Sequence, residues 1–495
     1  MNRAPNILFV MSDDHASHAM SCYGSRINRT PHLDRIADGG MRFDNCFCTN
    51  SICTPSRAAI LTGTYNHVNG VTTLDTMMDN RLQTFPKLLQ AAGYQTAHVG
   101  KWHLGQGPAH WPTGFDYWTV FPGQGRYHNP EMVEMTEHKV VPGYATDIVT
   151  DQSLHWLEQR DRSRPFLLMC HHKAPHRPWD PHPRHARRYE DEEIPYPETF
   201  DDDYAHRARA AAAAEMRIER DFIASDVKVD PPDPANPRRR LGAGTAALTP
   251  AGGEPVAFAS PHERKRWLYQ RYIKDYLRCV DAIDEGVGRL LDYLDDDGIA
   301  DDTIVIYTSD QGFFLGDHGW YDKRFMYEES LRMPFLVRYP REVSPGTVNG
   351  DMILNVDFPA TFLDCAGADI PPSFQGRSFR PLLEGETPKD WQTSMYYRYW
   401  MHGAHHNVCA HYGVRTLRFK LIYYYGDPLG QEGALGPTTE PEWELFDLEK
   451  DPCELYNVYA DPDYAEVVAE LKAELRRLQD KVGDSSTTRD FLRNL

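Results

Sequence analysis

Residues 6–18 read NILFVMSDDHASH. The run from Asn6 to Met11 is apolar, short and followed at once by polar residues, a pattern typical of a strand buried in a parallel sheet. The strand ends in two adjacent carboxylates, Asp13 and Asp14. In open α/β sheets, ligands bind beyond the carboxyl ends of the strands. The stretch therefore predicts both the fold class and the edge of the sheet that carries a site.

Strand and helix signals alternate through most of the chain. Segments 30–43 and 84–101 each read as a helix followed by a strand, and residues 165–170 read as another strand. Residues 266–298 have the periodicity of a long amphipathic helix, which leads into the buried strand at 303–309. This alternation predicts an α/β fold with a large, mostly parallel mixed sheet flanked by helices.

The composition changes twice along the chain. Residues 201–261 are rich in Pro, Gly and Ala, which predicts a surface insertion without a core of its own. Aromatic, strand-like pieces and a helix at 465–482 follow residue 384, and they predict a smaller α+β domain with an antiparallel sheet. We therefore expect an N-terminal domain over 1–384, which carries the site, and a C-terminal domain over 385–495.

Charge and composition exclude several classes of partner. The net charge of −19 argues against a protein that neutralises nucleic-acid phosphates. No apolar run approaches the roughly 20 residues that span a bilayer, and the sequence passes almost directly from Met1 into the first strand. The nine cysteines are scattered and odd in number, as in a reducing compartment. We expect a cytoplasmic protein without nucleic-acid or membrane partners, or a periplasmic or secreted one if a leader has been removed.

A second buried strand also ends in polar oxygen donors. The run IVIYTS is followed by Asp310 and Gln311. Taken alone, Asp13 could cap a helix and Asp310 could begin a turn. Together with Asp14 they make three carboxylates and one carboxamide at the same sheet edge. Such oxygen donors are the ligands that a hard cation, Ca²⁺ or Mg²⁺, prefers.

Basic side chains follow other predicted strands at that edge. Lys101 and His103 lie in GKWHLG, and His176 ends the segment HHKAPH after the strand at 165–170. Lys323 comes shortly after the second acidic strand end. Any one of them has an ordinary structural explanation, but cations gathered in a cleft bind anions even in an acidic protein.

The stretch SICTPSRAAILTG, residues 51–63, places Cys53 in the order C-x-P-S-R. A single cysteine is a common buried small side chain. Cys46, Cys48 and Cys53 could instead be thiolate ligands of zinc, although no fourth ligand lies nearby.

In combination, these motifs resemble the signature of the type I sulfatases, in the alkaline-phosphatase-like superfamily. C-x-P-S-R with AAILTG, the DD after the first strand, GKWHLG, the APH, SDQG and the downstream lysine occur in that family's order, from about residue 5 to residue 460. The resemblance implies the alkaline-phosphatase-like fold and a sulfuric ester hydrolase. It also implies that a formylglycine-generating enzyme, reading Pro55 and Arg57, oxidises Cys53 to Cα-formylglycine before folding.

The resemblance assigns roles to the polar residues. The cation, Ca²⁺ or Mg²⁺, would be held by Asp13, Asp14, Asp310, Gln311 and the modified Cys53. Gln311 departs from the Asn or His of many relatives. Arg57, Lys101 and Lys323 would neutralise the sulfuryl oxygens. His176, with Lys323 as an alternative, would protonate the departing alcohol, Asp310 would accept a proton, and His103 would take the proton of the second hydroxyl.

The sequence says less about the substrate than about the reaction. SDQG with HKAPHRPWDP, and HYGVRTLRFKLIYYY with ELFDLEKDP, resemble carbohydrate sulfatases, including those acting on the 6-sulfate of N-acetylglucosamine. We therefore expect a sulfated sugar, a short glycan fragment or a small sulfate ester. Trp179 would stack on a sugar ring, and the polar candidates for the sugar subsite are Asp180, His405, His406 and His411.

Two alternatives stay open. A phosphodiester or phosphonate monoester hydrolase of the same superfamily shares the formylglycine and the metal site, although the GKWHLG segment argues against it. A non-catalytic binder of sulfated glycans would result if Cys53 stayed a thiol.

Overall fold

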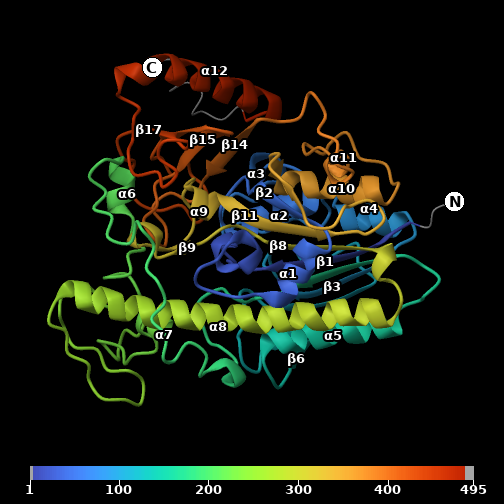
Figure 1. Ribbon diagram of the computed structural model, residues 1–495, viewed down its shortest axis with the longest axis horizontal. Coiled ribbons are helices and arrows are strands. Elements are labelled where there is room, and N and C mark those ends of the chain that lie inside the picture. Colours follow the sequence, from blue (N-terminus) through green and yellow to red (C-terminus); the bar gives the residue numbers. More distant parts are fainter. Residues whose placement is uncertain (1–3, 485–495) are drawn as a thin grey trace.

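The computed structural model describes residues 4–484. Within that range the largest sheet has 11 strands in the order β12-β2-β11-β8-β1-β7-β3-β4-β5-β6, with β13 also paired to β2 (Figure 1). Strands β8, β1, β7, β3 and β4 run parallel, whereas β11 is antiparallel to β8 and β2. The predicted mixed, mostly parallel sheet is confirmed. Its strands are β1 (Asn6–Ser12), β2 (Met41–Phe47), β3 (Gln95–Lys101), β4 (Tyr117–Phe121), β5 (Glu131–Glu134), β6 (Glu137–Val140), β7 (Phe166–His171), β8 (Thr303–Ser309), β11 (Arg332–Arg338), β12 (Thr347–Asn349) and β13 (Ile353–Leu354).

Helices cover both faces of this sheet. On one face α1 and α5 pack against α8, the long helix along the lower side of Figure 1; on the other, α10 packs against α2 and α4. Helix α8 was predicted over 266–298 and spans Pro261–Asp296, so it begins five residues earlier than predicted; Pro261 lies in its first turn and Ser260 Oγ accepts the Glu263 N–H at 3.1 Å. No helix within 4–484 combines the length and apolar character needed to cross a bilayer. The helix bounds are α1 (Pro31–Asp38), α2 (Cys53–Thr62), α3 (Asn66–Asn69), α4 (Phe85–Ala91), α5 (Ala145–Gln159), α8 (Pro261–Asp296), α9 (Glu328–Leu331), α10 (Phe358–Cys365) and α11 (Arg380–Leu383).

The C-terminal part forms its own antiparallel sheet, as predicted. Its order is β14-β15-β16-β17, and α12 (Ala465–Val482) packs across β14, β15 and β16 at the top of Figure 1. A buried charge cluster joins it to α9: Lys420 Nζ lies 2.9 Å from Glu328 Oε1 and 2.6 Å from Glu454 Oε1. The boundary between residues 384 and 385 stays a prediction. The strands are β14 (Ser394–Tyr399), β15 (His411–Thr416), β16 (Phe419–Tyr424) and β17 (Glu442–Asp447).

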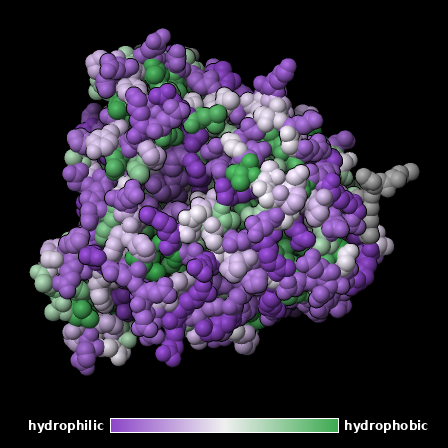
Figure 2. All heavy atoms as spheres, viewed as in Figure 1, coloured by the Kyte–Doolittle hydropathy of each residue, from purple (hydrophilic) through white to green (hydrophobic). Residues whose placement is uncertain are grey.

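The segment 201–261 has only two short helices, α6 (Arg209–Ala213) and α7 (Ala224–Val227). It is more than a surface insertion, however, because Met216, Ile218 and Phe222 are fully buried in the common core. The Phe222 ring stacks on Tyr321 with 4.2 Å between centroids. The segment is therefore part of the packed core, where its Phe222 contacts Tyr321. The face in Figure 2 is largely hydrophilic and is hollowed below the C-terminal sheet.

Candidate active site

The sheet register brings the two acidic strand ends together. Ser12 of β1 pairs with Ser309 of β8, so Asp13 and Asp310 leave the sheet side by side. The Asp14 N–H donates to Asp310 Oδ1 at 3.2 Å. Asp14 itself has φ of 70°, a conformation that a non-glycine residue adopts at a cost and that is common at functional sites. Residues nearly 300 positions apart therefore form one carboxylate cluster.

This cluster has the donors of a cation site. Oxygens of Asp13, Asp14 and Asp310 lie within 4.8 Å of one another, and all three side chains are buried. Gln311 donates through Nε2 to Asp14 Oδ1, while its Oε1 is buried without a hydrogen-bond partner in the range 4–484. Burial raises the pKa of Asp14 to about 6, against the lowering effect of Lys323. Three crowded carboxylates and a free amide oxygen fit a hard divalent cation.

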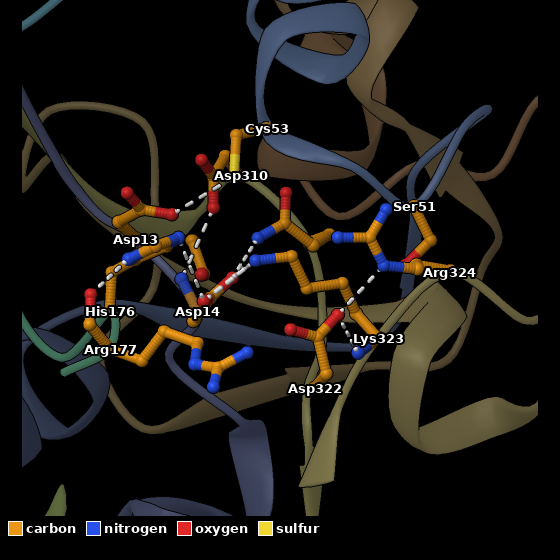
Figure 3. Close-up of polar contacts among 12 residues, drawn as sticks. Asp13, Asp14, Ser51, Cys53, His176, Arg177, Asp310, Asp322, Lys323 and Arg324 are labelled. Atoms are coloured by element: carbon orange, nitrogen blue, oxygen red, sulfur yellow. Dashed lines mark hydrogen bonds and ion pairs between the residues drawn. The ribbon is translucent and has the colours of Figure 1, made fainter. Parts of the chain in front are cut away.

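Cys53 stands at the edge of the cluster, as the first residue of α2 (Figure 3). Its Sγ donates to Asp13 Oδ1 at 3.4 Å. Pro55 fits the first turn of the helix, where a backbone N–H has no intrahelical partner. Burial raises the pKa of Cys53 to about 12. The unmodified thiol is therefore protonated at neutral pH and is a poor nucleophile.

The three predicted cations each pair with one carboxylate of the cluster. Lys101 Nζ contacts Asp13 Oδ2, and Lys323 Nζ lies 2.6 Å from Asp14 Oδ1. Arg57 Nε donates to Asp310 Oδ2 at 2.9 Å. Burial lowers the pKa of Lys101 well below its usual range; for Lys323, burial is outweighed by the negative charge of Asp14 and the pKa is raised. The site therefore places three basic side chains beside the position of Cys53.

The backbone packs closely against a neighbouring strand at Gly100, the residue before Lys101. Gly100 has φ of 105°, and a Cβ there would collide with the carbonyl oxygen of His171 on β7. Only glycine fits this approach between neighbouring strands. Lys101 is then held by Gln124, whose Oε1 accepts from Nζ. Gln124 was not among the site residues predicted from the sequence.

The two predicted histidines lie on loops, His176 against the carboxylate cluster and His103 against Thr54 of α2. His176 Nε2 lies 3.8 Å from Asp14 Oδ2, while Nδ1 lies 2.7 Å from the carbonyl of Arg177. That carbonyl can only accept, so Nδ1 carries a hydrogen and Nε2 is presented to the site. His103 has φ of 55°, and its Nδ1 lies 3.3 Å from Thr54 Oγ1. Burial, followed by the neighbouring lysines, lowers both histidine pKa values well below 6.5, so both rings are neutral.

Two residues flanking Lys323 were missed by sequence analysis. Arg324 Nε donates to Asp322 Oδ1 at 3.0 Å, and both side chains are buried beside the site (Figure 3). His406 Nε2 lies 3.2 Å from the other oxygen of Asp322. In the sequence DKR, the three residues read as an ordinary exposed charged turn. A signal was present nonetheless, because this charged run lies between apolar segments.

Two of the predicted sugar contacts are wrong. Trp179 is 0% exposed, and its ring packs on Tyr272 at 4.4 Å between centroids, so neither face is open to a sugar. His411 is also 0% exposed and stacks on Tyr397 inside the C-terminal sheet. Both belong to hydrophobic packing rather than to a ligand surface.

Of the other three proposed sugar contacts, His406 is buried against Asp322, whereas Asp180 and His405 lie at the surface. The Asp180 side chain is 50% exposed and lies 3.5 Å from His128 Nε2. His405 is exposed on a loop beside the buried His406. A sugar contact for Asp180 or His405 stays a prediction.

The zinc alternative finds no support in the geometry. Among residues 4–484, the clusters of three or more potential metal ligands contain neither Cys46 nor Cys48. Cys48 Sγ instead donates to the carbonyl of Leu331 at 3.4 Å. Burial raises the pKa of Cys46 well above its ordinary value, and burial likewise raises that of Cys48 to about 12.

Carboxylates grouped at the ends of parallel strands, with Cys53 beside them at the start of α2, are the arrangement expected of a hydrolase with the alkaline-phosphatase-like fold. Residues 5–368 match the sulfatase family model, and residues 316–481 match that of the N-sulphoglucosamine sulphohydrolase C-terminal region. The chain belongs to the sulfatase family and is a sulfuric ester hydrolase.

Individual relatives agree with this assignment. The chain is 44% identical to the N-acetylglucosamine-6-O-sulfatase of Bacteroides thetaiotaomicron, over 98% of this chain and 88% of that one. It is 26% identical to the human N-acetylglucosamine-6-sulfatase, over 93% of this chain and 80% of that one. A solved structure of a protein in complex with its substrate D-glucosamine-2-N,6-O-disulfate has a TM-score of 0.87 and 41% identity, over 98% of this chain and 99% of that one.

Proposed function

We propose that this chain releases sulfate from the 6-position of a glucosamine unit, free or at the end of a short glycan, with Cα-formylglycine at position 53 and Ca²⁺ as cofactors. The observation that carries the proposal is the pairing of three carboxylates with three cations around Cys53. The names of the similar proteins, which concern 6-sulfated and N,6-disulfated glucosamine, support the choice of sugar.

Asp13, Asp14, Asp310 and Gln311 would hold the cation. We favour Ca²⁺ because it accepts irregular arrangements of six to eight oxygens, whereas Mg²⁺ demands near-ideal octahedral geometry. A bound cation supplies Lewis-acid polarisation of a sulfate oxygen, and a hydrated formylglycine supplies a hydroxyl nucleophile. Asp13 Oδ1, at 3.4 Å from Cys53 Sγ, is the carboxylate oxygen placed to accept a hydrogen bond from the group at position 53.

The remaining side chains would bind the anion and move protons. Lys101, Lys323 and Arg57 present positive charge to the sulfuryl oxygens in a site from which water is largely excluded. A bound sulfate ester would also raise the pKa of neighbouring histidines, because an anion favours their protonated forms. His176 presents Nε2 to the site, where a proton can pass to the departing alcohol oxygen. His103, neutral before substrate binds, can accept a proton.

The polar pair beside Lys323 would hold the sugar. Asp322 supplies carboxylate oxygens and Arg324 supplies guanidinium N–H groups, and their mutual contact at 3.0 Å fixes both orientations. Such a preorganised donor and acceptor pair suits the hydroxyl groups of a sugar ring.

The test uses the chain produced together with a formylglycine-generating enzyme and supplied with Ca²⁺. Sulfate release is measured from N-acetylglucosamine 6-sulfate, N-acetylgalactosamine 4-sulfate and a phosphonate monoester. We expect release from the glucosamine 6-sulfate far above the other two. Faster hydrolysis of the phosphonate would favour the phosphonate hydrolase alternative. Binding without cleavage by fully modified protein would favour a glycan binder.

A further inference from the structure

Beside the site, the segment 201–261 and the loop at 402–407 enclose a second hollow. Its volume is about 770 Å³, within the range of roughly 300–1,000 Å³ typical of small-molecule sites. Its polar lining residues are Arg177, Asp221, Ser225, Arg238, Arg240, His405 and His406. The hollow is therefore large enough for a sugar-sized group, and the mechanism above makes no use of it.

The hollow and the catalytic site share a wall. His406, which lines the hollow, lies 3.2 Å from Asp322 Oδ2 and 3.3 Å from Arg177 Nη1. Asp322 directly precedes Lys323, the partner of Asp14. In Figure 3, Arg177 and Asp322 lie on the side of the site away from Cys53. The hollow therefore adjoins the catalytic residues through His406 and Arg177.

The charge of the lining favours an anion. Three arginines face one carboxylate there, in a chain whose net charge is −19. Arg177 is held by Asp226, and Arg240 lies 3.6 Å from Asp221 Oδ1 while also contacting Glu215. Arg238 is exposed and makes no ion pair or side-chain hydrogen bond within the described range. Its guanidinium is available to a ligand, and arginine binds sulfate and carboxylate groups in a bidentate manner.

We propose that this hollow binds a second anionic group of the substrate, a sulfate or a carboxylate, and that Arg238 contacts it. The inference rests on the proposed function and extends it, because it makes the segment 201–261 a determinant of specificity. The anion has two possible sources: an N-sulfate on the same glucosamine, or the carboxylate of a neighbouring uronate unit.

The test compares R238A with R239A, the adjacent exposed arginine that does not line the hollow. Sulfate release from the 6-position is measured with glucosamine 6-sulfate, glucosamine N,6-disulfate and a uronate-linked glucosamine 6-sulfate disaccharide. We expect R238A to lower kcat/KM about tenfold for one of the two dianionic substrates, as for loss of a charge-assisted contact. The monosulfated sugar should change less than about twofold, and R239A should resemble the wild type with all three.

The dianionic substrate that loses rate identifies the source of the anion. Equal behaviour of R238A and R239A with all three substrates would overturn the proposal. Failure of the proposed function gives a different result, namely no release from any of the three sugars by the wild type. In that case, calorimetric binding of glucosamine N,6-disulfate to wild type, R238A and R239A decides whether Arg238 contacts an anion; equal affinities would refute it.

Discussion

Lys323 and Asp14 form a bidentate ion pair in the interior of the site. Lys323 Nζ lies 2.6 and 2.7 Å from the two carboxylate oxygens, and the two residues are 2% and 0% exposed. A buried charge is costly unless it is paired. The pair therefore positions an ammonium group next to the carboxylate cluster that we propose binds the cation.

Replacement of Lys323 tests how much the buried Asp14 carboxylate depends on this ion pair. We expect K323A to lose stability by about 3–5 kcal/mol without divalent cation, because Asp14 is left buried and unpaired. Added Ca²⁺ should recover part of that loss, so the rise in Tm on adding Ca²⁺ should be larger than in the wild type. Sulfate release should fall at least about 100-fold. The control is K323R, which keeps the charge; an equal Ca²⁺ response in K323A and wild type would contradict the pairing.

Gln311 tests the cation cluster directly. Its buried Oε1 has no hydrogen-bond partner among residues 4–484, so we expect it to be a ligand of the cation. Q311L should weaken Ca²⁺ binding by about tenfold or more, measured by calorimetry. Q311E, which retains an oxygen donor, should bind Ca²⁺ at least as well as Q311L does. Unchanged affinity in Q311L would remove Gln311 from the ligand set.

His318 should make stability depend on pH. Burial lowers its pKa, but the hydrogen bond to Asp202 at 3.0 Å and the interaction with Glu329 outweigh burial and raise it to about 9. Because the folded pKa exceeds the ordinary 6.5, the stabilisation is fully present below about pH 6.5 and is lost as the pH rises through about 9. A shift of this size corresponds to about 3 kcal/mol.

The measurement is the difference in unfolding free energy between the wild type and H318Q at pH 6 and pH 9.5. We expect this difference to shrink at the higher pH. H155Q, at a side chain that is 73% exposed, should show no such trend. A constant difference for H318Q would mean that the imidazole is neutral in the folded protein.

Trp179 should behave as a core residue. W179A should destabilise the fold by about 3–5 kcal/mol, as expected for a buried tryptophan. W179F should keep most of the stability, because the indole Nε1 has no hydrogen-bond partner in the described part of the chain. KM for the sulfated sugar should be unchanged in W179F. A large rise in KM at unchanged Tm would restore the sugar-stacking role.

The strand ends could be predicted from sequence because two short apolar runs, each followed by carboxylates, are together typical of buried strands that end at the same edge of a parallel sheet. The pairing of Ser12 with Ser309 then brings the predicted ligands together. Trp179 and His411 could not be placed, since a sequence does not reveal which side of a loop or strand faces the core. Asp322 and Arg324 were missed because their burial depends on contacts with distant residues such as His406. The burial of Met216, Ile218 and Phe222 in segment 201–261 was missed for the same reason.

We expect catalysis to depend on conversion of Cys53, at the start of α2, to formylglycine. The decisive measurement is peptide mass spectrometry across residues 51–57 on protein preparations converted to different extents, each assayed for sulfate release from N-acetylglucosamine 6-sulfate. We predict that kcat rises in proportion to the aldehyde fraction and that C53A is inactive while binding Ca²⁺. Sulfate release by preparations that contain only the thiol would contradict the account.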